Sequence, residues 1–588
     1  MQISQERGLS LCGFFLFLCS VCSIAYVAGC GGASSKPLPI SVSVSPQTAA
    51  IGTSLTMQFT ATATNDSTGV TWTASAGTID SSGNYTAPAG PQSSTATVTA
   101  TSKADPTKSS SATVNVVSPG QVTATANVQV AQYTVSPAAS GNVSVQFGLD
   151  TNYGLTTWTQ PVPTGGGAVS LFVAGMKGNT LYHMRGVVAF SDGSQYMDTD
   201  LEFTTGAYPA AQLPSLTVTV TPGMTPQSGV EVLNAGKMVV ADLSGNILWA
   251  YTPMQTGVSP GPSKLLPNGH LLINFSDPAV LPDGTNSVLQ EVDWGGTVIW
   301  QMTAADLNKA LSVATCAGCN ITVVGTHHDF AILPNGHLIV IAAVQRNISG
   351  ATVTGDVLID LDENHKPVWL WNEFDHLDIN RRPYLYPDWT HTNAVIYSSD
   401  DGNLIVSIRH QSWLVKVDYA NGTGAGDIIW HLGYQGDFAL LGGTAPTDWF
   451  YAQHGPSFVS TNTTGNFILT LFDNGDDRVF HSGVTCGTTG ALPCHYSTVP
   501  VFQLDETAKT ATLSFHPIAA SYSFFGGNSE VLKNGNVEYC ESASGPGIAA
   551  DIFEVTQEPS AQKVWNMHIG AYAYRGQRIP SFYPGVQW

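Results

Sequence analysis

The stretch PNGHLLIN at residues 267–274 returns as PNGHLIVI at residues 334–341, and both join a tight turn to an apolar run. Four further stretches share this turn-and-strand pattern: NAGKMVVA from residue 234, DDGNLIVS from 400, TTGNFILT from 463 and KNGNVEYC from 533. From the second unit onward the turn glycines, at positions 269, 336, 402, 465 and 535, lie 63 to 70 residues apart. A repeat of this length holds one supersecondary unit and therefore decides the fold.

Each unit closes with a later strand, which in most units contains tryptophan. The closing strands are GNILWAY (245–251), GTVIWQM (296–302), KPVWLWN (366–372), DIIWHLG (427–433) and QKVWNMH (562–568), with TATLSFH (510–516) as a degenerate sixth. Each unit can hold a four-stranded blade, so we expect an all-β protein with a six-bladed β-propeller over residues 208–588. The first unit is short, and the C-terminal stretch YAYRGQRIPSFYP is expected to help close the ring. A stack of hairpins without closure is the alternative.

The composition agrees with many short strands joined by tight turns. Only 11% of the 588 residues are charged, whereas the chain has 59 glycines and 33 prolines. Long amphipathic helices need more charged residues than this, so an α-helical fold is disfavoured. The formal net charge of −21 argues against a nucleic-acid partner.

Two small β-sandwiches are expected before the propeller. Residues 38–118 alternate small apolar residues with Thr and Ser, and the turn GTIDSSGNYTAPA resembles bacterial immunoglobulin-like domains. Residues 119–207 form a second set of predicted strands that ends in LEFTTG and resembles a fibronectin-III-type sandwich. Neither region contains a cluster of His, Asp, Glu and Cys, so we interpret both as spacers or docking modules.

The first 29 residues are interpreted as a targeting segment. Arg7 precedes an apolar run from Leu9 to Ala28, and VAGC at 27–30 resembles the lipobox of bacterial lipoproteins. We expect Cys30 to be lipidated and residues 30–37 to form a tether to a bacterial membrane, with the protein facing the periplasm or cell surface. An ordinary signal peptide and an uncleaved anchor helix are the alternatives.

Export favours disulfide formation among the remaining cysteines. Cys486 and Cys494 bracket the loop GTTGALP and are expected to pair. The CAGC stretch at 316–319 is interpreted as a short disulfide loop, with a redox pair as the alternative.

Histidines precede the turns of three successive units. THHDFAILPNG carries His327 and His328, THTNAVIYSSDDG carries His391, and AQHGPSFVSTNTTG carries His454, each eight to eleven residues before the turn glycine. A single histidine at a strand start is usually structural. Equivalent positions in a ring point at one axis, so these three sites predict a cluster at one mouth of the channel.

The stretch from Asp388 to Trp413, DWTHTNAVIYSSDDGNLIVSIRHQSW, adds further polar groups. Alternation places His391 and Asn393 on one face of a strand and Arg409 on one face of the next. A strand that only packs does not carry such strong hydrogen-bonding groups toward a core. This face is therefore predicted to be a pocket wall.

Several motifs together resemble the bacterial arylsulfate sulfotransferases over about residues 215–588. They are HHDFAILPNGHLIVIA, DWTHTNAVIY, SIRHQSWLVKVDYANGTGAGDIIWHLG, QHGPSF with ILTLFDNGDDR, and AYAYRGQRIPSFYP. The resemblance implies transfer of a sulfuryl group from an aryl sulfate to a phenol, without a cofactor or nucleotide donor. It implies a ping-pong mechanism through a sulfated histidine.

The site residues follow from the same resemblance. His454 matches the nucleophile, His391 and Asn393 match the HxN pair, and Arg409 matches the arginine of SxRxxSW. Arg409 supplies a fork of N–H donors for the sulfuryl oxygens, Asn393 adds an amide donor, and a histidine can protonate the departing oxygen.

The histidine of the HHD motif stays open between His327 and His328. Alternation, which aligns Asp329 with Asn393, favours His327. Four aromatic residues are proposed to flank a phenol ring, with ordinary packing as the alternative: Trp413, Trp449, Phe450 and Tyr451. The stretch DNGDDR at 473–478 is interpreted as a turn.

Two other functions are compatible with the pattern. The histidines could hold a metal in a propeller lyase or oxygenase, although a cationic Arg409 beside them disfavours a bound cation. A non-catalytic surface propeller that binds anionic ligands or proteins is the other alternative. We expect no metal, and we expect small phenols, aryl sulfates and, through the lipid, a membrane as partners.

Overall fold

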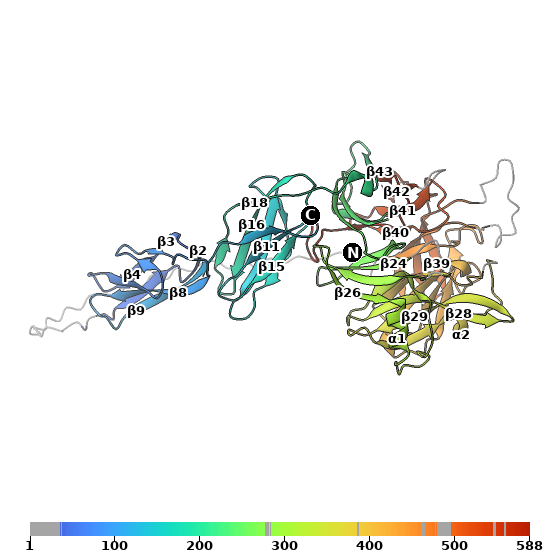
Figure 1. The fold of residues 1–588 in the computed structure, drawn as a ribbon, viewed down its shortest axis with the longest axis horizontal. Coiled ribbons are helices and arrows are strands. Elements are labelled where there is room, and N and C mark those ends of the chain that lie inside the picture. Colours follow the sequence, from blue (N-terminus) through green and yellow to red (C-terminus); the bar gives the residue numbers. More distant parts are fainter. Residues whose placement is uncertain are drawn as a thin grey trace, which may run out of the picture.

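A computed structural model describes residues 36, 38–276, 282, 284–384, 387–459, 465–476, 478, 495–544, 549–557 and 560–588. The described chain is almost entirely β-strand, which confirms the all-β class, and Figure 1 shows it as three successive regions. Its helices are α1 (Ala304–Leu311), α2 (Glu373–His376), and the 3-10 turns η1 (Ala210–Gln212), η2 (Arg409–Gln411) and η3 (Ala420–Gly422). Over these residues, no helix has the length and apolar composition needed to cross a membrane.

The first region contains three small sheets. They are β1 (Ser41–Ser45) with β4 (Thr60–Thr64); β2 (Thr48–Gly52), β9 (Ser109–Val117), β8 (Ser94–Ser102) and β5 (Val70–Ala74); and β3 (Thr56–Gln58), β7 (Asn84–Thr86) and β6 (Thr78–Ile79). Alternation of Thr with Ala or Val along β8 turns Ala96, Val98 and Ala100 inward, where they pack with Phe59 and Tyr85.

The second region has two sheets. One contains β10 (Gln121–Ala124), β11 (Ala131–Val135) and β15 (Val169–Val173); the other contains β13 (Leu155–Thr156), β12 (Gly141–Gly148), β16 (Leu181–Phe190) and β17 (Gln195–Met197), with β14 (Gln160–Pro161) and β18 (Leu201–Thr204) at its sides. The C-terminal Trp588 packs on Phe147 of this core, and its indole N–H donates to the carbonyl of Thr156 at 3.0 Å. The end of the chain therefore fastens the second region to the third.

The third region contains six antiparallel sheets of four strands, two of which gain an extra edge strand. In spatial order within each sheet they are β44 (Gly576–Ile579), β20 (Val230–Asn234), β21 (Met238–Asp242), β22 (Ile247–Tyr251); β23 (Ser259–Leu265), β24 (Leu271–Ser276), β25 (Val288–Val292), β26 (Val298–Thr303); β27 (Gly325–Ile332), β28 (Leu338–Ile348), β29 (Ala351–Leu361), β30 (Pro367–Asn372); β31 (Thr392–Ser398), β32 (Asn403–Ile408), β33 (Trp413–Val417), β34 (Ile428–Leu432); β36 (His454–Phe458), β37 (Asn466–Phe472), β38 (Val501–Asp505), β39 (Thr510–Phe515), plus β35 (Ala439–Leu441); and β40 (Asn528–Val531), β41 (Val537–Ser544), β42 (Ala549–Val555), β43 (Lys563–Ile569), plus β19 (Leu216–Val220).

The repeat of the sequence maps onto these sheets with one shift. In the second to sixth sheets the repeated glycine joins the first two strands with a positive φ of 72° to 86°, as at Gly336. In the first sheet Gly236 joins β20 to β21 instead, which are the second and third strands. This unit is short because its first strand, β44, comes from the far end of the chain.

Contacts link the sheets in sequence order and return from the sixth to the first. The first strands touch their neighbours along the series β23, β27, β31, β36, β40 and β44. Four closing tryptophans donate an indole N–H into the third-to-fourth-strand turn of the following sheet: Trp249 to Trp294 O, Trp371 to Gly426 O, Trp430 to Glu506 Oε1 and Trp565 to Leu243 O, at 2.8 to 2.9 Å. The last of these bonds joins the sixth sheet to the first.

The cysteines are partly accounted for. Cys316 and Cys319 form a disulfide, so the CAGC stretch is a short disulfide loop. Cys540 is a buried free thiol. Cys30 and the predicted pair Cys486 and Cys494 lie outside the described residues, and those expectations stay predictions.

Candidate active site

Three histidines from successive sheets meet at one end of their first strands. His328 belongs to β27, His391 immediately precedes β31, and His454 begins β36. The ring of His328 lies 4.8 Å from that of His391, and the ring of Tyr574 lies 5.7 Å from His328 and 6.0 Å from His454. The predicted convergence of the three strand starts is thus present in the structure.

The backbone is irregular at each of these strand starts. The ladders shift register at the beginning of β27, β31 and β36, and His328, His391 and Ala452 have positive φ values of 49° to 54°. Such conformations are unfavourable for residues with a Cβ and are concentrated at functional sites. The irregularity turns the histidine rings out of the regular strand alternation.

His328, rather than His327, lies beside His391. His327 is buried and its Nε2 contacts Asp356 Oδ1 at 2.9 Å, while its Nδ1 lies 2.6 Å from Nδ1 of His328. The alternation that favoured His327 fails because His328 is left-handed and the ladder between Thr326 and Phe330 is interrupted. Burial first, and then the adjacent His391, holds the pKa of His328 well below its usual value.

His454 is held in one tautomer by Asn474. The Asn474 amide nitrogen donates to the carbonyls of Ser523 at 2.7 Å and Gly526 at 3.1 Å, so its Oδ1 is the acceptor facing His454 Nδ1 at 2.6 Å. Nδ1 therefore carries the proton, and Nε2 keeps a lone pair, which the Gly526 N–H approaches at 3.3 Å. Burial first, and then the charge of Arg409, holds the pKa of His454 well below its usual value, so the ring is neutral.

His391 has a different partner, a carboxylate. Its Nδ1 makes a short hydrogen bond to Asp388 Oδ2. Burial by itself raises the pKa of Asp388, but the charge and hydrogen bond of His391 outweigh it and hold that pKa below the usual range. Asp388 is therefore ionised beside His391.

His410 stacks on His391 at a ring separation of 4.7 Å and connects it to Arg409. Its Nδ1 donates to the Asp388 carbonyl at 2.7 Å, and its Nε2 accepts from Arg409 at 2.6 Å. Both nitrogens are thereby used by a neutral ring. Burial first, then His391 and Arg409, holds the pKa of His410 well below its usual value.

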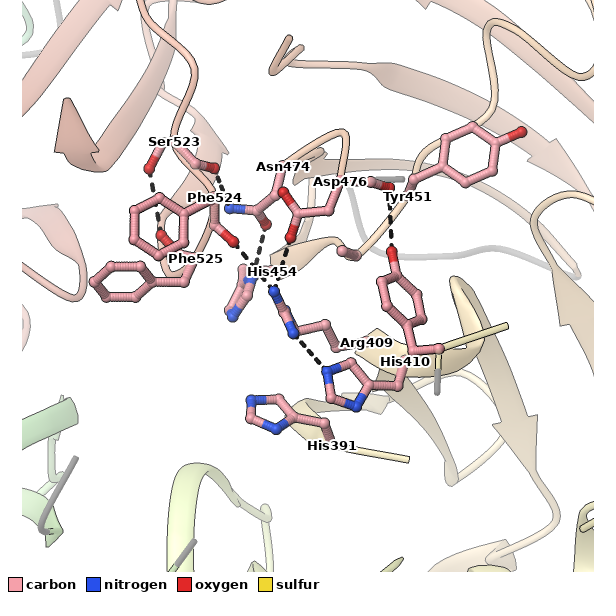
Figure 2. Close-up of polar contacts among 12 residues, drawn as sticks. His391, Arg409, His410, Tyr451, His454, Asn474, Asp476, Ser523, Phe524 and Phe525 are labelled. Carbon is pink, nitrogen blue, oxygen red and sulfur yellow. Dashed lines mark hydrogen bonds and ion pairs between the residues drawn. The ribbon is translucent and has the colours of Figure 1, made fainter. Parts of the chain in front are cut away.

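Arg409 lies at the start of η2, just beyond β32, and not within a strand as the alternation suggested. One terminal nitrogen donates to Asp476 Oδ2 at 2.8 Å and to the Phe524 carbonyl at 3.1 Å. Figure 2 shows the guanidinium between His454 and His410, with Asp476 above it. The structure thus places the predicted arginine among the predicted histidines.

A cavity of about 790 Å³ opens over this cluster. Its lining residues are Pro282, Gln345, Thr352, Thr354, Tyr384, Pro387, Asp388, His391, Arg409, His410, Asp476, His495, Tyr522 and Phe524. The long hairpin of β28 and β29 forms one wall of it. His454 is only 1% exposed and lies behind Arg409 in Figure 2.

Asn393 lies deeper than predicted. It is fully buried, and its amide nitrogen donates to the Gln453 carbonyl at 2.7 Å, which joins β31 to the residue before His454. The carbonyl of Asn393 accepts from Arg575 at 3.1 Å. Asn393 does not line the cavity, so its contacts here brace the neighbouring strands.

The aromatic residues proposed to flank a ring are used for packing. Trp449, Phe450 and Tyr451 are buried in the core of the fifth sheet, and Trp413 is stacked under Arg381 at 3.5 Å. The aromatic side chains that line the cavity are instead Tyr384, Tyr522 and Phe524, together with His495.

One donor set at the site has the spacing of a metal centre. Single ligand atoms of Asp388, His391 and His410 lie within 4.8 Å of one another. However, both nitrogens of His410 are already hydrogen-bonded, and the Arg409 guanidinium contacts one of them. A cation would meet this positive charge and find no lone pair on His410, so the three do not suit a metal.

Four contributing residues escaped the sequence interpretation. Asn474 and Asp476 lie in DNGDDR, which reads as a turn, and Asp388 and His410 adjoin the quoted motifs without a role assigned to them. The signal that could have found the last two is their position three residues before His391 and one after Arg409.

Comparisons with solved structures give only weak likenesses. A crystal structure titled as the eukaryotic initiation factor has 9% identity and a TM-score of 0.24, covering 78% of this chain and 89% of that chain. The V. cholerae biofilm matrix protein Bap1 has 10% identity and a TM-score of 0.14 over 76% and 90%, and Salmonella alpha-2-macroglobulin reacted with methylamine has 9% and 0.12 over 91% and 44%. These low TM-scores carry no argument about fold or function.

No curated protein matches the chain. A family model, by contrast, matches residues 194–575, which is more than half of the sequence and spans every histidine and arginine described above. The match also agrees with the order of the motifs along the chain. The chain therefore belongs to the arylsulfotransferase (ASST) family.

Proposed function

We propose that residues 208–588 form a six-bladed β-propeller that transfers a sulfuryl group from an aryl sulfate to a phenol through a sulfohistidine on His454. The observation that carries this proposal is the neutral His454, whose unprotonated Nε2 lies beside the guanidinium of Arg409. Membership of the arylsulfotransferase family supports the reaction class and the aromatic substrates.

The propeller is supported by the contacts between the six sheets. Their first strands follow one another around a series that ends at β44, which pairs with β20 of the first sheet. The Trp565 bond to the Leu243 carbonyl joins the last sheet to the first. Completion of the first blade by the C-terminal strand is the usual way to fasten such a ring against opening.

In the first half-reaction Nε2 of His454 attacks the sulfur of the donor ester. The N–S bond forms as the S–O bond to the aryl group breaks, and the departing oxygen takes a proton from His391. The three outer sulfuryl oxygens carry negative charge, for which Arg409 supplies fixed N–H donors. The Nδ1 proton of His454 stays on the ring, where Asn474 accepts its hydrogen bond.

In the second half-reaction the acceptor phenol gives its proton to His391 and its oxygen attacks the same sulfur. The N–S bond breaks and its electron pair returns to Nε2 of His454. Donor and acceptor occupy the cavity in turn, which gives ping-pong kinetics.

The N-terminal segment supports a proposal about location. An apolar run that ends in VAGC favours an exported protein held to a bacterial membrane by a lipid on Cys30. Comparison of wild type with Cys30→Ser in membrane and soluble fractions tests it, and retention of the variant in the membrane contradicts it.

The catalytic proposal is tested by mixing the protein with a chromogenic aryl sulfate and no acceptor. We expect a burst of at most one equivalent of phenol and an adduct of one SO₃ on the peptide that holds His454. His454→Ala should show neither. An adduct on His391 or His328 moves the nucleophile, and intersecting double-reciprocal lines without an adduct rule out the covalent route.

A further inference from the structure

The two histidines that meet at the cavity have Nδ1 partners of opposite character. His454 Nδ1 faces a neutral amide oxygen of Asn474, and His391 Nδ1 faces the carboxylate of Asp388. The partner of Nδ1 decides which ring nitrogen carries a proton and how readily the ring becomes charged. A carboxylate favours the imidazolium form, whereas an amide oxygen that accepts a hydrogen bond favours a neutral ring with a free Nε2.

We propose that Asn474 and Asp388 are positioning residues that divide the reaction between the two histidines, Asn474 fixing His454 as nucleophile and Asp388 fixing His391 as the proton carrier. The inference rests on the sulfuryl transfer proposed above. Neither Asn474 nor Asp388 touches the reacting atoms in it, because each acts through the Nδ1 side of a ring whose Nε2 side does the chemistry.

The orientation of Asn474 is fixed by its own surroundings. It is fully buried, and both contacts of its amide nitrogen are main-chain carbonyls that accept and cannot donate. A flip of the amide would place N–H against Nδ1–H and an oxygen against two carbonyl oxygens. Asn474 therefore presents only an acceptor to His454, which keeps the proton on Nδ1.

Asp388 has a second function through its main chain. Its carbonyl accepts from His410 Nδ1, and His410 Nε2 accepts from Arg409. One residue thus orients His391 through its side chain and, through neutral His410, the guanidinium that faces the sulfuryl oxygens. His410 insulates the acid–base pair from Arg409, because a neutral ring stands between the two charged groups.

The charged groups around each ring agree with this division. His454 faces the cations Arg409, His391 and Arg575, which all disfavour its protonation. His391 faces the anionic Asp388 and the rings of His328 and His410, whose pKa values are both depressed. A proton shared within the cluster therefore belongs on His391.

The test is the pH profile of the phenol burst with donor alone, which isolates the first half-reaction. A nucleophile must be deprotonated, so the rate rises with pH through its pKa; an acid must be protonated, so the rate falls above its pKa. Asp388→Asn removes an anion beside the acid and should move the alkaline limb to lower pH by about one unit or more. Asn474→Asp adds an anion beside the nucleophile and should move the acidic limb to higher pH by a similar amount.

Control variants separate this role from a structural one. Asn474→Ala removes the acceptor without adding charge, so it should slow the burst and leave the acidic limb where it is. Asp388→Ser should repeat the alkaline shift if the asparagine variant does not fold. Asp200→Asn removes the carboxylate from a second Asp–His pair, with His183 at 2.7 Å in the β16–β18 sheet, and should change neither limb.

The outcomes are distinct. A slower burst with both limbs unmoved in folded Asp388→Asn and Asn474→Asp proteins overturns the proposal and leaves both residues structural. Shifts in opposite directions to those expected also overturn it. A wild-type protein that releases no phenol from any aryl sulfate contradicts the proposed function itself, before either variant is compared.

Discussion

Two pockets of the third region each contain a buried arginine, and they treat it differently. The cavity of about 790 Å³ is lined by Arg409, and a smaller pocket of about 210 Å³ is lined by Arg575. Arg575 donates to Asp329 Oδ2 at 2.8 Å, and Lys264 lies 3.1 Å from the other oxygen of the same carboxylate. In the small pocket the charges are therefore paired with one another across β23, β27 and the segment before β44.

Arg409 is paired less completely. Of its three contacts one is a carboxylate, Asp476, and the others are the neutral His410 ring and the main-chain carbonyl of Phe524. A buried cation with neutral partners retains attraction for an incoming anion, whereas a fully paired cation has little left. The difference teaches that residue type alone does not mark the anion site; the partners do.

The largest effect should come from Arg409→Lys. Lysine keeps the charge but loses the planar fork that contacts two sulfuryl oxygens at once. We expect turnover to fall on the order of 10²-fold, as for loss of one oxyanion donor, with unchanged thermal stability. Steady-state rates and a melting curve measure both.

Arg185→Lys, in the sheet of β12 and β16, is the matched control and should leave turnover unchanged. Near-normal rates for a folded Arg409→Lys protein would give Arg409 the same structural role as Arg575 and remove the contrast between the pockets.

Arg575→Lys should give the reverse pattern at a smaller size. The charge beside Asp329 is kept, but the second bond, to the Asn393 carbonyl, is lost inside the protein. We expect a loss of about 1–3 kcal/mol in the free energy of unfolding and a decrease in turnover well below that of Arg409→Lys. Denaturant titration measures the first, and a fall in turnover larger than that of Arg409→Lys contradicts the assignment.

The sequence predicted the large-scale arrangement because it is periodic. Turn glycines such as Gly336 and closing tryptophans such as Trp565 recur at fixed places in each unit, and each does the same physical work in its sheet. The convergence of His391 and His454 follows from equivalent positions in successive units.

Local exceptions to the period could not be predicted. His328 replaced His327 beside His391 because of a left-handed residue within the strand, and Arg409 left the strand for a 3-10 turn. Asn474 lies 20 residues from His454, at the end of the following strand, so only the paired sheet brings them together. Trp449 was proposed for the substrate because composition does not distinguish a cavity wall from the packed core beside it.

The smallest effect concerns Phe524, which lines the cavity with its ring 52% exposed. Its contact to Arg409 uses the main-chain carbonyl, so Phe524→Ala leaves that bond in place and removes only the ring. An aromatic substrate that stacks there would lose about 0.5–1.5 kcal/mol, which corresponds to a roughly 2- to 12-fold rise in KM with kcat nearly constant. Phe458→Ala is the matched control, because Phe458 lines the small pocket and packs against the core of the fifth sheet; it should lower the melting temperature and leave KM unchanged. If Phe524→Ala instead lowers kcat and leaves KM unchanged, the ring acts through Arg409 and not on the substrate, and the cavity loses its aromatic wall as a basis for choosing phenols.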